Sequence, residues 1–204
     1  MTKIFKTTEI SKALSIYQKA DIIAFPTDTV YGIGANIFNE EAIKKIYRIK
    51  NRPQNKPIAV LCANLEQIKM IVEHIPEPIS KLINYFLPGP LTVILPKNKI
   101  IPNYVTSNLA TIGIRIPNHP LSLELLKAIG PLATTSANKS GEDSINNGNE
   151  VINEFINDVD IIIDGGITDI GVASTVVAVE HNEVQIIREG SITKAMINSV
   201  LKKS

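Results

Sequence analysis

The sequence contains no tryptophan and only one cysteine in 204 residues. Cys62 therefore has no partner for an internal disulfide, and a metal site built from several cysteines is excluded. The histidines His74, His119 and His181 are scattered without the spacing of metal ligands, so we expect no metal-binding motif. The formal net charge is +1, which gives no general excess of positive charge to attract nucleic acid or a membrane surface. Any anion-binding site must therefore be local.

Long hydrophobic segments are absent as well. Residues 1–6 contain no extended apolar run of the kind found in signal peptides, and no segment approaches the ~20 apolar residues of a membrane-spanning helix. We therefore expect a cytoplasmic protein without membrane association. Known phosphate-binding loops are also missing: Gly166 and Gly171 have P-loop spacing, but Val172 and Ala173 follow where Lys and Ser or Thr are needed.

Hydrophobic residues make up 44% of the sequence, which is enough for a substantial core. Short apolar runs predict strands at residues 22–25, 57–62, 91–95, 112–116, 132–135, 159–163, 174–179 and 184–187, the last two joined as a hairpin through residues 180–183. Amphipathic segments predict helices at residues 10–17, 64–72, 78–86, 120–129, 151–156 and 193–201, and one that begins after Asn39. Asn39 is the expected N-cap of that helix, and Gly130 closes the helix at 120–129. We predict an α/β fold in a single domain, residues 1–204, with a twisted mixed sheet flanked by helices.

A polar segment, Pro26-Thr-Asp-Thr-Val-Tyr-Gly-Ile-Gly34, directly follows the first predicted strand. Proline, aspartate and glycine are frequent turn residues, so a simple turn is the favoured interpretation when the segment is taken alone. The functional alternative is a substrate-binding lip, because open α/β sheets bind ligands beyond the carboxyl ends of their strands.

Three cations, Lys50, Arg52 and Lys56, stand close together near the end of the second predicted helix. Cations are common at helix C-termini, where they complement the negative end of the dipole. Here, however, Pro53 and Pro57 stiffen the backbone that carries them, which lowers the entropy lost on meeting an anion. Arginine also offers the bidentate donors that suit a triphosphate.

Small polar residues follow the strand predicted at 132–135, in the segment Thr134-Thr-Ser136-Ala-Asn138-Lys-Ser-Gly141, with Ser144 just beyond. This is either a flexible loop or a set of neutral hydrogen-bond donors for a nucleotide. Two arginines lie at other strand ends. Arg115 is either an outward-facing or edge-strand charge or a ligand-binding residue. Arg188 is either part of a surface ion pair or a phosphate-binding residue.

Together these segments resemble the YrdC-type threonylcarbamoyl-adenylate synthases, over residues 7–193. The likeness rests on the segment 26–34 and on Lys50-x-Arg52-Pro, Leu87-Pro-Gly-Pro-Leu-Thr, Arg115-Ile-Pro, Ser136-Ala-Asn138-x-Ser-Gly, Ser174-Thr-Val-Val and Arg188-x-Gly190. Each motif is short, but their joint presence in family order is specific. Longer members of the family carry a second domain, and this chain is similar to the short form.

The resemblance implies an ATP-using nucleotidyltransferase and a set of site residues. Lys50, Arg52, Ser136 and Asn138 would be its catalytic quartet. ATP would contact Arg52, Lys56, Thr111, Thr134, Ser136, Ser144 and Arg188. Threonine would contact Thr27, Tyr31, Arg115 and Ser174. Mg²⁺ would arrive with ATP and be held mainly by the nucleotide.

The implied reaction joins L-threonine, bicarbonate or CO2, and ATP into threonylcarbamoyl-adenylate. A downstream tRNA threonylcarbamoyl transferase complex would receive this product, while direct tRNA binding would be weak at most. No protein nucleophile is needed, which agrees with the lack of a Ser/His or Cys/His constellation. Two other functions stay open: a non-catalytic RNA-binding module, disfavoured by few aromatic residues and low net charge, and a carbamoyl-transfer domain acting on another carbamate.

Overall fold

The computed structural model describes residues 1–180 and 183–202. Within them one mixed sheet of ten strands has the order β1-β8-β2-β3-β7-β4-β6-β5-β9-β10. The strands are β1 (Lys3–Lys6), β2 (Ile23–Phe25), β3 (Gly32–Asn36), β4 (Ala59–Leu61), β5 (Leu91–Pro96), β6 (Thr111–Arg115), β7 (Leu132–Ser136), β8 (Ile161–Asp164), β9 (Thr175–Glu180) and β10 (Glu183–Arg188). The helices are α1 (Ile10–Ile16), α2 (Glu40–Ile49), α3 (Leu65–Ile71), α4 (Glu77–Phe86), α5 (Pro120–Ile129), α6 (Gly148–Phe155) and α7 (Lys194–Leu201), with 3-10 turns at Thr7–Glu9 and Asn103–Val105. The predicted α/β fold with a mixed sheet is confirmed.

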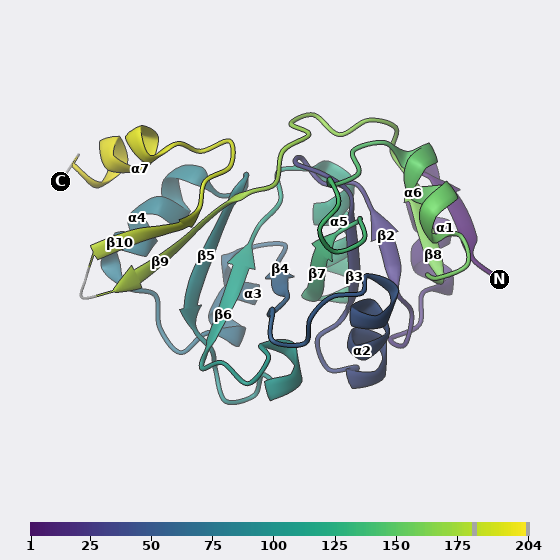
Figure 1. Ribbon diagram of the computed structural model, residues 1–204, viewed down its shortest axis with the longest axis horizontal. Helices are drawn as coiled ribbons and strands as arrows, with labels where there is room; N and C mark the ends of the chain where they lie inside the picture. The colour runs from purple at the N-terminus through teal and green to yellow at the C-terminus, as the bar shows by residue number, and fades with distance from the viewer. Residues whose placement is uncertain (181–182, 203–204) are drawn as a thin grey trace.

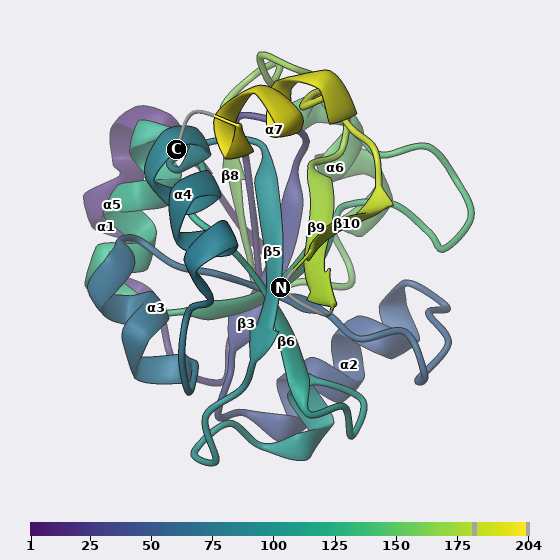
Figure 2. The ribbon, with the colours of Figure 1, turned by 90° about the vertical axis from the view of Figure 1, so that its left-hand side faces the viewer.

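The sheet twists strongly along the long axis of the molecule, with β10 at one end and β1 at the other (Figure 1). Helices α1, α3, α4 and α5 gather on one side of it, whereas α2 lies on the other (Figure 2). No helix in the described ranges is long and apolar enough to cross a bilayer.

The central strands have one side in the core and one side in a cavity. Val60 of β4, Ile114 of β6 and Val93 of β5 lie side by side in the strand register and are fully buried. Their neighbours Ala59 and Gly113 point to the opposite face, where they line the cavity. This alternation follows from the two-residue period of a strand. The cavity-facing positions are therefore set by the strand register.

The predicted helix ends are confirmed. Asn39 accepts a hydrogen bond from the Ala42 N–H at 2.9 Å as the N-cap of α2. Gly130 ends α5 with a φ of +90°, a conformation that glycine adopts easily. Strands β9 and β10 pair antiparallel as predicted, while His181 and Asn182 of the expected turn lie outside the described residues.

Two strands lie where the sequence predicts none. β1 is an exposed edge strand rich in lysine, so it lacks the apolar pattern of a buried strand. β3 begins at Gly32, so the turn interpretation of this part of the segment is wrong. Its glycines are required by space: a Cβ at Gly32 would lie 2.8 Å from Thr134 Cγ2, and one at Gly34 would lie 2.8 Å from Thr134 Oγ1.

Candidate functional site

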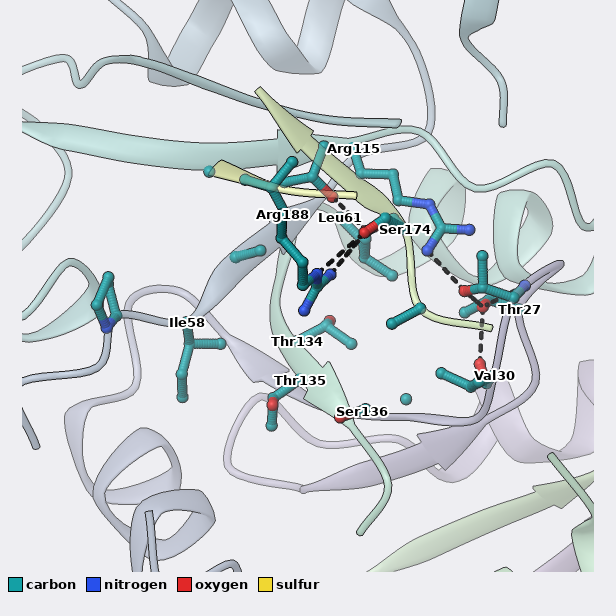
Figure 3. Close-up of a pocket in the computed structure, with 18 of the residues that line it drawn as sticks. Thr27, Val30, Ile58, Leu61, Arg115, Thr134, Thr135, Ser136, Ser174 and Arg188 are labelled. Atoms are coloured by element: carbon teal, nitrogen blue, oxygen red, sulfur yellow. Dashed lines mark hydrogen bonds between the residues drawn. The ribbon is translucent and has the colours of Figure 1, made fainter. Parts of the chain in front are cut away.

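A cavity of about 300 Å³ opens on the face of the sheet opposite the core residues of β4, β5 and β6 (Figure 3). Residues of β3 to β7, β9 and β10 line it, together with the segment before β3. Of the residues predicted from sequence, most line this one cavity: Thr27, Tyr31, Arg52, Thr111, Arg115, Thr134, Ser136, Ser174 and Arg188. Lys50, Lys56, Asn138 and Ser144 do not.

Arg115 lies at the centre of the sheet, with 6% of its surface exposed. It ends β6, which runs between β4 and β5, so both structural alternatives, an outward-facing residue and an edge-strand charge, are wrong. Its guanidinium donates from Nε to Gly89 O (2.9 Å) and from Nη1 to Thr29 Oγ1 (2.7 Å), and Nη2 forms an ion pair with Asp28 Oδ1. The same Asp28 oxygen accepts the Asn118 N–H at 3.0 Å.

Asp28, Thr29 and Gly89 hold the Arg115 guanidinium in a fixed position at the cavity. Burial lowers the pKa of Arg115, while the charge of Asp28 and its hydrogen bond raise it. Arginine titrates so far above neutrality that the group remains charged. Because Arg115 lines the cavity and three contacts do not use all five of its N–H donors, it can bind a carboxylate there.

Hydroxyl groups extend this network from Arg115 along the cavity (Figure 3). Thr27 Oγ1 donates its single proton to Val30 O at 2.7 Å. In the 3.0 Å contact between the hydroxyls of Thr27 and Thr29, Thr29 must therefore be the donor. Thr27 Oγ1 also accepts the Thr29 N–H at 3.2 Å. Thr27, a predicted threonine ligand, thus has no free donor, and its hydroxyl orients the groups that hold Arg115.

Arg188 ends β10 and contacts Ser174, and both residues line the cavity (Figure 3). It donates to Ser174 O from Nε (3.1 Å) and from Nη2 (2.8 Å), and Nη2 lies 3.3 Å from Ser174 Oγ. Its polar contacts are thus with Ser174 and not with a surface carboxylate. Because the Arg188 guanidinium contacts both the backbone oxygen and the hydroxyl of Ser174, its direction is fixed.

Arg52 lines the same cavity as Arg188. The chain leaves α2 through Asn51, whose φ of 50° is in the left-handed region. Arg52 then donates from Nε to Lys56 O (3.0 Å) and from Nη2 to Pro57 O (2.8 Å). Burial and, second, the charge of Arg52 lower the pKa of Arg188, so the two guanidinium groups lie within electrostatic reach of each other. Two cations that face one cavity favour a polyanionic ligand between them.

Lys50 lies behind the cavity with 1% of its surface exposed. Its Nζ donates to Ser136 O (2.5 Å), to Asn138 O and to Asn138 Oδ1 (3.2 Å). Burial, followed by the charges of Arg52 and Lys139, lowers the pKa of Lys50 to about 8. These three acceptors match the three donors of an ammonium group. The structure therefore makes Lys50 a support for the segment after β7.

Asn138 belongs to the same support. Its Oδ1 accepts the Ser136 hydroxyl at 2.6 Å, and its Nδ2 donates to Lys139 O and Glu142 O, both at 2.8 Å. Ser136 itself lines the cavity, so the asparagine fixes a cavity residue from outside. Ser144 is half-buried beyond this segment. Its predicted contact with ATP, like that of Lys56, stays a prediction.

The Tyr31 hydroxyl is directed away from the predicted threonine position. It accepts the Gly165 N–H at 2.8 Å and donates to Gly166 O at 2.9 Å. Burial raises the pKa of Tyr31 to about 12, so the hydroxyl remains neutral. Tyr31 thus fastens the connection after β8 to the wall of the cavity.

Gly190 makes the closest backbone approach in the site. A Cβ at this position would lie 2.2 Å from Ala173 O, 2.7 Å from Thr175 N and 2.8 Å from the carbonyl carbon of Ser174. We expect Gly190→Ala to cost about 1–3 kcal/mol of stability and to displace Ser174, because backbone atoms cannot move aside cheaply. Urea unfolding measures the change. Gly113→Ala is the control: its Cβ would lie 3.5 Å from its nearest neighbour, so it should unfold near the wild-type midpoint. Equal urea midpoints for the wild type, Gly190→Ala and Gly113→Ala would contradict the predicted clash at Gly190.

Three residues of this network are not predicted as site residues from the sequence. Asp28 and Thr29 stand inside the recognised segment but have the composition of a turn, and Thr92 stands in an apolar strand. Their roles depend on the neighbouring strands: Arg115 meets Asp28 and Thr29, and Thr92 meets Ser174 at 2.8 Å. Thr92 is the last residue of the recognised motif Leu87-Pro-Gly-Pro-Leu-Thr, and the alternation of β5, which puts it on the side opposite Val93, is the sequence signal for its position in the cavity.

The fold and the cavity together are characteristic of one class of protein. In this class a twisted mixed sheet carries arginine and hydroxyl side chains that converge on one face. A family model named for Sua5, YciO and YrdC, with the description "Telomere recombination", matches residues 15–190. The chain belongs to this Sua5/YciO/YrdC family.

Individual relatives agree with this assignment. The threonylcarbamoyl-AMP synthase of Bacillus subtilis is 40% identical over 95% of this chain and 56% of its own length. That of Pyrococcus abyssi is 37% identical over 95% of this chain and 57% of its own length. The crystal structure of P. abyssi Sua5 complexed with L-threonine superposes with a TM-score of 0.92 at 36% identity, covering 98% of this chain and 61% of that one. The chain thus spans less than two thirds of the length of these relatives.

Proposed function

We propose that this protein is an L-threonylcarbamoyladenylate synthase, which condenses L-threonine, bicarbonate or CO2, and ATP into threonylcarbamoyl-AMP and pyrophosphate. The observation that carries the proposal is the convergence of Arg115, Arg52 and Arg188 on one cavity. A single fixed arginine suits a carboxylate, and a facing pair suits a chain of phosphates. The names of the relatives support the same activity.

The reaction needs positioning more than a protein nucleophile. The threonine amine bonds to the carbon of CO2 and loses a proton, which gives a carbamate. A carbamate oxygen then bonds to the α-phosphorus of ATP, and the bond to the leaving pyrophosphate breaks. Arg115 would hold the threonine carboxylate, while Arg52 and Arg188 would stabilise charge on the phosphates. Cys62, the single cysteine, is buried with its pKa raised to about 12, so it would remain a neutral thiol.

Magnesium would enter with the nucleotide. Within the described residues no group of three or more histidine, cysteine, aspartate or glutamate side chains is arranged to hold a metal, and the residues lining the cavity include no carboxylate. The phosphate oxygens of ATP, together with water, would therefore be the ligands of the ion. The adenylate would pass to a downstream tRNA threonylcarbamoyl transferase complex in the cytoplasm, and direct tRNA binding would be weak because few phosphates could be neutralised.

Pyrophosphate release with each substrate omitted in turn tests the proposal. We expect release only when ATP, threonine and bicarbonate are all present, because the attacking oxygen exists only after the carbamate has formed. Equal release without threonine would contradict the proposal and favour carbamoyl transfer to another substrate. Tight, salt-dependent tRNA binding without ATP turnover would favour the RNA-binding alternative instead.

A further inference from the structure

Two buried hydroxyl groups meet on the floor of the cavity, between Arg115 and Arg188. Thr92 of β5 and Ser174, which precedes β9, are 5% and 6% exposed, and both line the cavity. Their Oγ atoms are 2.8 Å apart. The antiparallel register that pairs Val93 with Ile114 places Thr92 beside Arg115 on the same face of the sheet. Arg188 contacts Ser174 from the other side.

This hydroxyl pair retains unused hydrogen-bonding capacity. Two hydroxyl groups have two protons and four lone pairs. The bridge between Thr92 and Ser174 uses one proton and one lone pair, and Arg188 uses a second lone pair on Ser174. One proton and two lone pairs remain, whichever of the two residues donates in the bridge. Thr27 differs, because its proton goes to Val30 O and its oxygen accepts two bonds from Thr29.

The remaining donor and acceptors match a hydroxyl group of a ligand. A phosphate or carboxylate accepts hydrogen bonds only, so it would use the single donor and leave the acceptors facing its negative charge. A ligand hydroxyl both donates and accepts, which uses both capacities. The methyl carbon Cγ2 of Thr92 is turned towards Gly113, 3.5 Å from the position of a Cβ there, so the Thr92 hydroxyl keeps its direction towards Ser174.

We infer that the Thr92–Ser174 pair recognises the side-chain hydroxyl of the amino-acid substrate, and that Thr92 determines its specificity. The inference rests on the proposed function, since it takes an amino acid with its carboxylate on Arg115 as the ligand. Arg115 binds what all amino acids share, and the neighbouring hydroxyl pair selects those that carry a hydroxyl. An analogue without this hydroxyl leaves the buried pair unsatisfied, which is the situation in which binding sites discriminate strongly.

Binding of L-threonine and L-2-aminobutyrate, measured by calorimetry without ATP or bicarbonate, tests the inference. L-2-aminobutyrate keeps the methyl group and lacks the hydroxyl. We expect the wild type to prefer threonine by ~100-fold or more, and Thr92→Val, which keeps the side-chain shape, to reduce this ratio at least ~10-fold. Thr92→Ser keeps the hydroxyl and should retain the preference. Thr111→Val is the matched control, because it removes a hydroxyl from another part of the cavity and should leave the ratio unchanged.

Thermal melts of each variant separate folding from binding. An unchanged ratio in a folded Thr92→Val protein would overturn the inference, as would equal binding of the two amino acids by the wild type. Pyrophosphate release tests the proposed function independently, so a wild type that selects threonine but makes no pyrophosphate would refute the activity and support this inference. A wild type that binds neither amino acid would overturn it. Should Thr92→Val fail to fold, Ser174→Ala tests the same pair with the same expected loss.

Discussion

Replacing Arg115 with methionine should both destabilise the protein and remove its affinity for threonine. Methionine fills similar space but leaves the Asp28 carboxylate buried without a cation. Removing one partner of a buried ion pair costs about 3–5 kcal/mol, which corresponds to a fall in melting temperature of roughly 6–20 °C for a chain of this size. Under the proposed function, loss of the charge-assisted contact from Arg115 to the ligand carboxylate should weaken threonine binding roughly 100-fold.

The double variant Asp28→Asn/Arg115→Met separates the two effects. An asparagine at 28 still accepts from Asn118 N but carries no charge, so much of the lost stability should return. Threonine affinity should not return, because the cation proposed to bind the carboxylate is still missing. Melting temperature and calorimetry measure the two quantities on the same proteins. Recovery of threonine binding in the double variant would show that Arg115 acts only through the fold.

Lys50→Met should have the second largest effect, although Lys50 does not line the cavity. The change leaves Ser136 O and both Asn138 oxygens without the ammonium that holds them. Asn138 O is then left without a partner, which costs about 1–3 kcal/mol, whereas Ser136 O keeps the Asn138 N–H at 3.1 Å and Asn138 Oδ1 keeps the Ser136 hydroxyl at 2.6 Å. Ser136 loses its fixed position as well, and nucleotide affinity should fall at temperatures where the variant is still folded.

Lys44→Met is the matched control for this prediction, since Lys44 lies on α2, the helix that Lys50 caps, with half of its side chain exposed, and pairs at the surface. Its loss should leave the free energy of unfolding nearly unchanged, because exposed ion pairs contribute little to stability. Urea unfolding and ATP calorimetry on both variants decide the matter. A Lys50→Met protein with wild-type stability and weak ATP binding would return Lys50 to the nucleotide site, where sequence resemblance places it.

The sequence predicts the elements of this fold better than it predicts their partners. Apolar periodicity and the caps at Asn39 and Gly130 locate the helices, because these signals are local. β3 is missed because Gly32 and Gly34 have turn composition, and the reason for glycine there is Thr134 on a strand one hundred residues later in the chain. The space that a glycine leaves for a side chain on a neighbouring strand produces no pattern in the local sequence.

The site shows the same limit. The motifs identify Arg115, Arg188 and Ser136, all of which line the cavity. They do not separate residues that face the ligand from residues that support those residues. Lys50 is next but one to Arg52 in sequence, yet its ammonium is buried behind the cavity while Arg52 faces it. That difference arises where α2 ends and the chain turns through a left-handed residue, which a motif does not record.

The position of β8 in the sheet bears on how the chain acquires its structure during synthesis. β8 lies between β1 and β2, pairing Ile161 with both Lys3 and Ile23. During synthesis on the ribosome, the edge of β2 that pairs with β8 therefore stays unpaired until the nascent chain has been extended through Asp164. Such delayed, non-local pairing slows folding and exposes an apolar edge to other chains. The lysines of β1 lie at the outer edge of the sheet, beyond β8, so they do not cover the edge of β2 before β8 has been made.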